Sequence, residues 1–258
     1  MTDGAQPDAL ALVNVPTEAE LLRLIADCLT QGRGFAVATL NLDHIVKLRQ
    51  QPDFHAAYLA QTHVVADGNP LVWLAKLAGR KDVRLVPGSE LIKPLANLAA
   101  ARGVPVALFG STDVVLHAAA ARMTADNDNL TIAACLSPEF GFDPLSPKAD
   151  ALLDRIAASG ARLCFLALGA PKQELLAARG LARHPHLGFV SIGAGLDFIA
   201  GHQTRAPLWV RKIAMEWLWR MLTNPRRLAR RYLDCLLILP GLTWAALRER
   251  SRKGTETP

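Results

Sequence analysis

The sequence predicts an α/β protein with a doubly wound, mostly parallel sheet and a helical, basic appendage at the C-terminus. Two observations lead to this prediction. Six short apolar runs alternate with helix-length segments, and the last fifth of the chain differs in composition from the rest. Such alternation is typical of a parallel sheet that helices cover on both faces. We therefore expect a Rossmann-like domain at residues 1–204, an appendage at 205–250 and a disordered tail at 251–258.

The expected strands are short and apolar throughout, as in sheets that are buried on both faces. They cover 35–41, 63–68, 104–110, 130–137, 162–169 and 188–195. Helix-length segments lie around and between them, at 16–32, 71–79, 89–103, 112–128, 147–160 and 171–183. The first of these segments begins with Thr17 and has Glu20 three residues later, which is the pattern of a helix-capping box.

The positive charge of the protein is concentrated in the expected appendage. Residues 205–258 hold 12 Lys or Arg and 4 Asp or Glu, a net charge of +8, whereas residues 1–204 hold 17 and 19, a net charge of −2. Four of the five tryptophans also lie in the appendage. Arginine suits phosphate oxygens, and tryptophan suits a boundary between apolar and wet surroundings. The pattern indicates a phosphate-bearing partner at a membrane face, with a solvated basic surface or a nucleic-acid patch as alternatives.

Within the appendage, the stretch 233–247 is apolar but is interrupted by Asp234 and by the pair Pro240-Gly241. As a helix it would reach only about 22 Å, which is less than the ~30 Å of a hydrocarbon core. We expect it to lie in the membrane interface or in the protein core rather than to span a bilayer. Neither a signal peptide nor a membrane anchor is visible at the N-terminus, so a cytoplasmic location is expected.

Cysteine and histidine spacings give no sign of a metal site. The four cysteines form no CxxC pair, and the seven histidines show no ligand spacing such as HExxH. We expect the cysteines to be small buried apolar residues, and we predict neither a metal nor a cofactor.

Glycines and polar residues gather where the expected strands end, and ligands bind at these ends in an open parallel sheet. Gly110, Gly169 and Gly195 stand at such ends, where a following helix exposes backbone N–H groups to an anion. A plain strand-to-helix turn also uses glycine, and neither a P-loop nor a complete GxGxxG is present. Asp67 directly follows an apolar strand, so its carboxylate suits a general base at the rim of a ligand cleft, a cap for the next helix, or both.

Seven strings stand in a fixed order along the chain, and PKQE and the arginine-rich string at the end are the most specific of them. The strings are TLN (39–41), ADGNP (66–70), VPGSEL (86–91), LGAPKQE (168–174), GAGLDFIAG (193–201), RAPLW (205–209) and EWLWRMLTNPRRLARRY (216–232). Together they resemble the motifs of the WecG/TagA/CpsF glycosyltransferase family over about residues 35–235. The resemblance implies an inverting transferase in bacterial surface polysaccharide synthesis. Such an enzyme moves a sugar from a UDP-sugar onto a polyprenyl-diphosphate-linked saccharide at the inner face of the plasma membrane.

The resemblance also implies roles for residues at the strand ends. Asp67 would deprotonate the acceptor hydroxyl, with Thr39 and Asn41 beside it in the pocket. Gln173 and Asp197 would contact the donor, and the carboxylate of Asp197 suits the ribose hydroxyls.

Aromatic and basic residues complete the implied site. Phe140 or Phe142 would stack on uracil. In place of a metal, tail arginines would neutralise the diphosphate, namely Arg220, Arg227 and Arg230. The arginine that the family usually has three residues before the glycine of VPG is displaced here by one residue to Arg84, with Leu85 in its place, and Arg84 is the expected substrate-binding arginine of this string.

Two other classes of function remain open at this point. One is a nucleotide-sugar-binding module without catalysis, and the other is a nucleic-acid-binding protein that uses the basic tail. The expected partners are the UDP-sugar, the lipid-linked acceptor and the cytoplasmic membrane surface, without nucleic acid. The motifs specify neither the donor sugar nor whether the protein forms a homo-oligomer.

Overall fold

The computed structural model describes residues 9–203, 207, 210, 219, 221 and 225–255, including their side chains except at 225–228 and 253–255. Its centre is a six-stranded sheet in the order β2-β1-β6-β5-β3-β4, in which every neighbouring pair is parallel. The prediction of a doubly wound parallel α/β sheet is confirmed. The strands are β1 (Phe35–Leu40), β2 (His63–Ala66), β3 (Val106–Gly110), β4 (Ile132–Leu136), β5 (Leu163–Ala167) and β6 (Gly188–Ser191).

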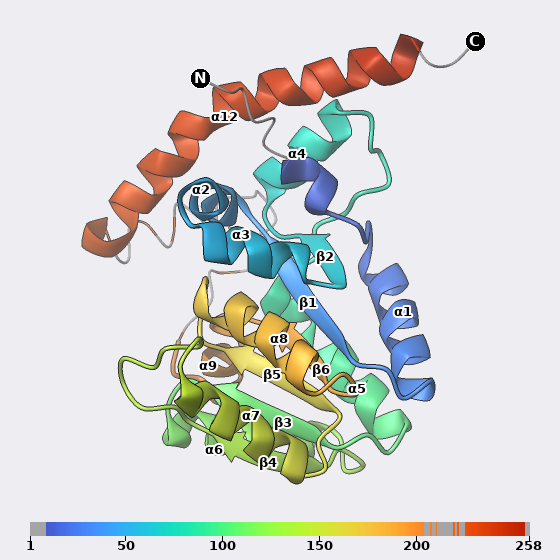
Figure 1. The fold of residues 1–258 in the computed structure, drawn as a ribbon, viewed down its shortest axis with the longest axis vertical. Helices are drawn as coiled ribbons and strands as arrows, with labels where there is room; N and C mark the ends of the chain where they lie inside the picture. The colour runs from blue at the N-terminus through green and yellow to red at the C-terminus, as the bar shows by residue number, and fades with distance from the viewer. Residues whose placement is uncertain are drawn as a thin grey trace.

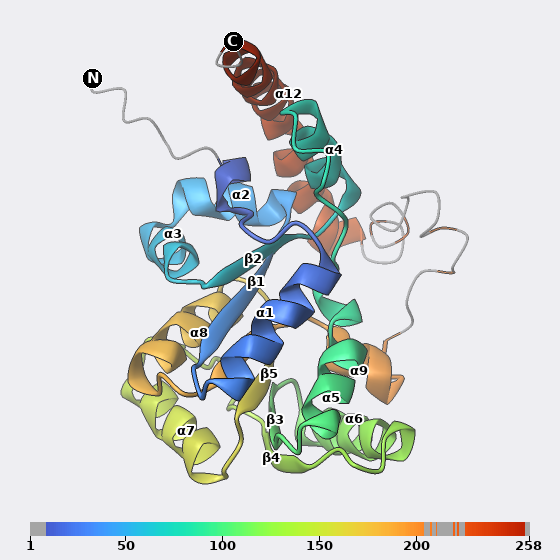
Figure 2. The ribbon, with the colours of Figure 1, turned by 90° about the vertical axis from the view of Figure 1, so that its right-hand side faces the viewer.

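Helices cover both faces of the sheet, as Figure 2 shows with the sheet between them. One side carries α1 (Glu18–Thr30), α5 (Ile92–Ala101), α6 (Asp113–Asp126) and α9 (Gly195–Ala200). The other side carries α3 (Pro52–Leu59), α7 (Pro147–Ala158) and α8 (Lys172–Arg183). The remaining elements are η1 (Ala9–Leu12), α2 (Leu42–Gln50), α4 (Asn69–Leu77), η2 (Gly88–Glu90) and α12 (Pro225–Thr255).

Five of the strands are buried, because successive side chains point to opposite faces and both faces are covered, whereas the edge strand β4 is partly buried. On β3, for example, Leu108 packs into the cluster with α1, α5 and α6, whereas Phe109 packs into the cluster with α7 and α8. The predicted start of the first helix is confirmed, because the Thr17 hydroxyl accepts a hydrogen bond of 3.2 Å from the N–H of Glu20.

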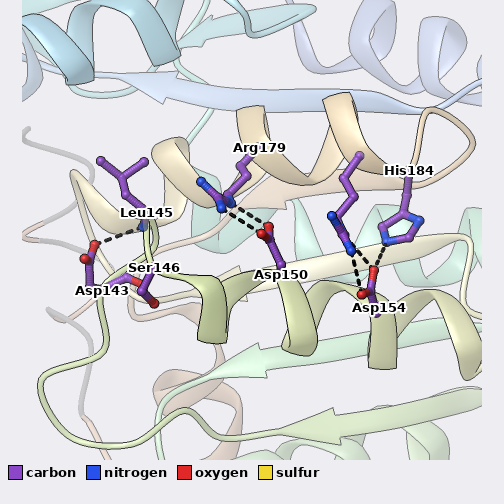
Figure 3. Close-up of polar contacts among 8 residues, drawn as sticks. Asp143, Leu145, Ser146, Asp150, Asp154, Arg179 and His184 are labelled. Carbon is purple, nitrogen blue, oxygen red and sulfur yellow. Dashed lines mark hydrogen bonds and ion pairs between the residues drawn. The ribbon is translucent and has the colours of Figure 1, made fainter.

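The second half of α8 is joined to α7 by charged side chains (Figure 3). Arg179 contacts both carboxylate oxygens of Asp150, at 2.7 and 2.8 Å, and Arg183 contacts both oxygens of Asp154, at 2.6 and 2.7 Å. The Arg183 hydrogen bonds lower the pKa of Asp154 to about 2. Two-point contacts of this kind fix the relative position of the two helices.

The C-terminal helix α12 runs for 31 residues, contains Pro240 and changes direction partway along (Figure 1). A proline inside a helix removes one hydrogen bond and usually bends the helix without ending it. Pro240-Gly241 therefore does not interrupt the helix, and residues 251–255, expected in the disordered tail, belong to it. Within the described residues, none of the helices combines the length and the apolar composition that a membrane span requires.

One face of α12 packs against α2 and α4, where Leu242 and Ala246 are buried. Another face exposes large apolar side chains to solvent, namely Leu233, Leu236, Leu237, Trp244 and Leu247. Part of the expected appendage thus contributes to a hydrophobic core that also contains strand residues. The domain boundary near residue 204 stays a prediction.

Candidate active site

Two of the expected catalytic residues leave neighbouring strands at the same level. The register pairs Leu40 of β1 with Ala66 of β2, so Asn41 and Asp67 are the next residues of adjacent strands. The N–H of Asp67 donates to the carbonyl of Leu40 at 2.7 Å, which continues the strand pairing by one step. Both side chains are half-buried, as expected at the rim of a ligand site.

The helices that follow these strands begin differently. Asn41 is the N-cap of α2, and its side-chain oxygen accepts from the N–H of His44 at 3.0 Å. The N-cap of α4 is Gly68, with a φ of 102°, so Asp67 stands one residue before the cap position. Asn41 therefore has a structural role in addition to the one implied for it, and its amide nitrogen is a hydrogen-bond donor at the end of β1.

Thr39 is buried at the carboxyl end of β1, beneath the loop of the VPG string. Gly88 of that loop lies so close that a Cβ atom there would be 3.2 Å from Thr39 Oγ1 and 2.9 Å from the carbonyl of Ser191. A larger residue at position 88 would push the loop away from the ends of β1 and β6. The sequence string is thus explained by close packing over the expected site.

The end of β3 carries the residues on the expected donor side. Gly110 has a φ of 105°, and a Cβ atom there would be 2.5 Å from the carbonyl of Ala167 on β5. The Ser111 hydroxyl lies 3.4 and 3.5 Å from the two carboxylate oxygens of Asp197 on α9. Gly195 begins α9, and it packs tightly against Ile92 of α5. Asp197 is therefore held opposite the end of β3.

Gln173 joins α8 to the loop that follows β6. Its side-chain oxygen accepts from the N–H of Gly193 at 3.1 Å, and its side-chain nitrogen donates to Glu174 Oε1 at 2.8 Å. The N–H of Gln173 donates to the carbonyl of Gly169 at 3.2 Å. Gln173 is buried, so its side chain ties together the loops that end β5 and β6.

Glu174 is a buried carboxyl that the sequence analysis did not assign to the site. Its side chain is fully buried, and this burial raises the pKa of its carboxyl to about 7, although the hydrogen bond from Gln173 lowers it. Nearby, Gln61 donates to the Glu174 carbonyl at 3.1 Å. Its position in the sequence was the signal that could have revealed it. Glu174 shares the buried side of α8 with Leu176 and Ala177, and a carboxylate is unusual on such a side.

More buried polar groups lie on α2 and α3. His44 Nδ1 is 2.7 Å from the Tyr58 hydroxyl. Burial lowers the pKa of His44 to about 3. Burial raises the pKa of Tyr58, and the carboxylates of Glu174 and Asp67 raise it further. A layer of polar groups therefore lies close enough to the expected catalytic carboxylate to interact with it electrostatically.

A chain of charged contacts leads from α12 to the loop before α8. Arg231 Nε of α12 lies 3.0 Å from Asp43 Oδ1 of α2. Lys47 Nζ, also on α2, lies 2.6 Å from Asp43 Oδ2. Lys47 also donates to the carbonyl of Ala170 at 3.2 Å. Arg230, the neighbour of Arg231, is exposed. The described part of the basic tail is thus attached to the body close to the strand-end loops.

Some predicted site residues lie elsewhere or outside the described residues. Phe142 is buried edge-to-face against Phe109, with 5.8 Å between ring centroids, which leaves it little surface for a base, whereas Phe140 is fully exposed. The Arg84 guanidinium donates to the carbonyls of residues 81 and 83 in its own loop. Arg220 and the side chain of Arg227 lie outside the described residues.

A groove of about 520 Å³ lies between η1, α2, α3 and α12, and its lining includes none of the predicted site residues. Its lining is apolar at Leu12, Ile45, Leu48, Leu242 and Ala245, and it is basic at Arg49, Arg248 and Arg252. Over the parts of the chain that the structure describes, no group of three or more His, Cys, Asp or Glu side chains is arranged to hold a metal ion.

The fold and these residues define an α/β protein with a candidate ligand site at the carboxyl edge of a parallel sheet. The sequence profile described as "Glycosyl transferase WecG/TagA/CpsF family" matches residues 10–255, which is nearly the whole chain, and the protein belongs to this family. It is therefore a glycosyltransferase of a family that acts in surface polysaccharide synthesis.

Proposed function

We propose that this glycosyltransferase moves a sugar from a UDP-sugar to a polyprenyl-diphosphate-linked saccharide, with inversion and without a metal ion. The observation that carries the proposal is the meeting of Asp67, Asn41 and Thr39 at the ends of two paired strands, under the Gly88 loop. A carboxylate at such an edge is placed as a general base would be. The loops of Gln173 and Asp197 reach the same edge of the sheet and supply groups for the donor.

The proposed reaction is a single displacement. Asp67 takes the proton of the acceptor hydroxyl, and the acceptor oxygen forms a bond to the anomeric carbon of the donor sugar. The bond between that carbon and the β-phosphate oxygen of UDP breaks, and UDP leaves with the electron pair. Asn41 and Thr39 orient the acceptor, because amide and hydroxyl groups at the end of β1 can bind sugar hydroxyls.

The donor is proposed to lie along the ends of β5, β6 and β3. Asp197 accepts hydrogen bonds from the ribose hydroxyls, and backbone N–H groups near Gly110, Gly169 and Gly195 face the diphosphate. Phe140 replaces Phe142 as the residue that stacks on uracil, because Phe140 is the exposed one of the two.

Positive charge for the leaving diphosphate is proposed to come from Arg220, Arg227 and Arg230. Support comes from the next residue, Arg231, whose contact with Asp43 holds this turn of α12 beside α2. Because Asn41 is the N-cap of α2, the first turn of this helix lies at the same edge as the proposed acceptor site. Arginine suits this task since its fixed fork of donors matches phosphate oxygens.

We further propose that the protein binds the cytoplasmic face of the membrane peripherally through α12. The exposed leucines and Trp244 of this helix form an apolar surface, and the guanidinium of Arg248 lies 3.4 Å from the centre of the Trp244 ring. Apolar side chains beside basic ones favour a helix that lies in the interface of an anionic bilayer.

A panel of UDP-sugars, other nucleotides and oligonucleotides in thermal-shift assays tests the proposal, followed by transfer to a lipid-diphosphate acceptor. We expect stabilisation by a UDP-sugar and turnover that persists in EDTA. Activity that EDTA abolishes and Mn²⁺ restores would contradict the role of the arginines. Affinity for oligonucleotides that falls steeply with salt, without selectivity for UDP, would favour a nucleic-acid-binding protein instead.

A further inference from the structure

Glu174 is a buried carboxyl that the proposed reaction does not use. One of its oxygens accepts the hydrogen bond from Gln173, and the other, Oε2, has no hydrogen-bond partner among the residues that the structure describes. Gln61 Oε1 is a second buried oxygen without a hydrogen-bond partner among the described residues. The amide nitrogen of the same side chain donates to the backbone carbonyl of Glu174. Two unsatisfied acceptors in one buried region need a donor, because a buried polar atom without a partner is costly.

A proton on Glu174 supplies such a donor. Among the described residues, Lys47 of α2 is the cation that favours a charge on Glu174, but Lys47 is bound to Asp43 and to the Ala170 carbonyl. Asp43 of α2 disfavours a charge on Glu174, and Tyr58 of α3 also interacts with it. Burial outweighs the favourable contacts and raises the pKa of Glu174 to about 7, so the neutral acid predominates at lower pH.

The same carboxyl determines the orientation of a side-chain amide. The two ends of the Gln173 amide have nearly the same shape, but one end donates and the other accepts hydrogen bonds. Glu174 Oε1 binds the donating end at 2.8 Å, so the accepting end faces the N–H of Gly193 at 3.1 Å. A reversed amide would place two donors against each other at Gly193.

We propose that Glu174 is a positioning residue for donor binding, which fixes the Gln173 amide and through it the loop that starts at Gly193 and leads to Asp197. The proposal rests on the proposed function, because it assumes that this loop contacts the UDP-sugar. It assigns Glu174 no contact with the substrate. Its effect is to order the loop before the donor arrives, which lowers the entropic cost of binding.

Three variants of the full chain test this role. Glu174→Ala removes the acceptor for Gln173, whereas Glu174→Gln keeps an acceptor and adds a fixed donor, as the neutral acid does. Glu139→Gln is the matched control, because it makes the same chemical change at an exposed carboxylate that pairs with Lys148. The measurements are hydrogen exchange at the Gly193 amide, the Kd of UDP, and the KM and kcat for the donor.

For Glu174→Ala we expect exchange at Gly193 to be about tenfold faster and the donor KM to rise about tenfold, with a smaller change in kcat, as one lost hydrogen bond implies. Glu174→Gln should restore both values, and Glu139→Gln should match the wild type. If Glu174→Ala does not fold, a fourth variant, Glu174→Met, still tests the proposal, because it fills the buried space without offering an acceptor to Gln173 and should show the same faster exchange at Gly193.

Protection of Gly193 that is unchanged in Glu174→Ala or Glu174→Met, or a Glu174→Gln variant that does not restore it, would overturn the proposal. A wild type that binds no UDP-sugar would instead overturn the proposed function. Hydrogen exchange distinguishes the two failures, because it reports the Gly193 contact in the absence of donor.

Discussion

Residues 9–203 and helix α12 handle apolar surface in opposite ways. In the body, the strands lie between helices and their large apolar side chains are almost all buried. In α12, Leu242 is 3% exposed on the side that packs against the body, whereas Leu237, five residues earlier, is 70% exposed. A row of exposed leucines on one face of a helix indicates a surface that is used for binding. Under the proposed function, the body carries the chemistry, and the helix supplies the location and the positive charge.

The largest expected effect tests whether the body carries the chemistry. Asp67→Asn should lower turnover by roughly 10² to 10⁴, the usual contribution of a general base, and leave UDP affinity and melting temperature nearly unchanged. Steady-state transfer and UDP titration measure this, with Asp128→Asn as an exposed control. A lower melting temperature with turnover preserved would show that Asp67 supports the start of α4 rather than the reaction.

The strands of the body could be predicted because short sequence patterns reveal them. The six apolar runs form the six strands because each is short and apolar throughout, and both faces of the sheet are covered. Helices α2 and α3 were not predicted. Their starts carry Asn41 and Pro52, of which Asn41 was assigned to the site although it also caps a helix. A residue with two roles is not resolved by a local pattern.

The site was only partly predictable, for a different physical reason. Asp67 and Asp197 could be placed from the sequence because each follows the end of an expected strand. Parallel strands all end at the same edge of a sheet, where ligands bind. The partners of Glu174 depend on how α8 packs against α3 and on which strands are neighbours. Neither of these can be read from a short stretch of the sequence. Helix α12 continues to residue 255, past the expected start of the disordered tail, and burial of Leu242 and Ala246 stabilises the helix beyond Pro240.

The second prediction separates the two faces of α12 by one matched pair. Leu242→Ala should lower the free energy of unfolding by about 2–5 kcal/mol, because it leaves a cavity against α2 and α4. Leu237→Ala should change it by less than about 0.5 kcal/mol but weaken binding to anionic liposomes. Urea denaturation and liposome flotation measure the two effects. Equal losses of stability would mean that both faces of the helix are buried, and the comparison would fail.

The third prediction concerns pH and the buried polar groups of the body. The folded pKa of Glu174, about 7, lies above its ordinary value of 4.5. Its contribution to stability is therefore fully present below pH 4.5 and is lost as the pH rises to about 7, a loss on the order of 3 kcal/mol. For His44 the folded pKa of about 3 lies below 6.5, so its contribution is lost as the pH falls.

Because the two slopes oppose each other between pH 4.5 and 6.5, the wild-type curve alone does not separate them. The difference in unfolding free energy between wild type and Glu174→Gln isolates the carboxyl, and it should decrease from pH 4.5 to 7 and be flat above. A difference that is constant with pH would show that Glu174 is ionised in the folded protein.

The smallest expected effect tests the ion pair that attaches α12 to the body. Arg231 and Arg183 are almost equally exposed, at 41% and 42%, but their partners differ: Asp43 is 11% exposed and Asp154 is 48% exposed. A charge contact with a partly buried carboxylate is less screened by water than one at the surface. A double-mutant cycle of Arg231→Ala with Asp43→Asn should therefore give a coupling of about 1 kcal/mol in urea denaturation. The cycle of Arg183→Ala with Asp154→Asn should give a smaller coupling.

Lys47 stays beside Asp43 in Arg231→Ala, so the fold should persist and the cycle should remain measurable. If the two couplings are equal, the Arg231 contact is an ordinary surface pair, and the placement of the neighbouring Arg230 near the diphosphate loses its structural support.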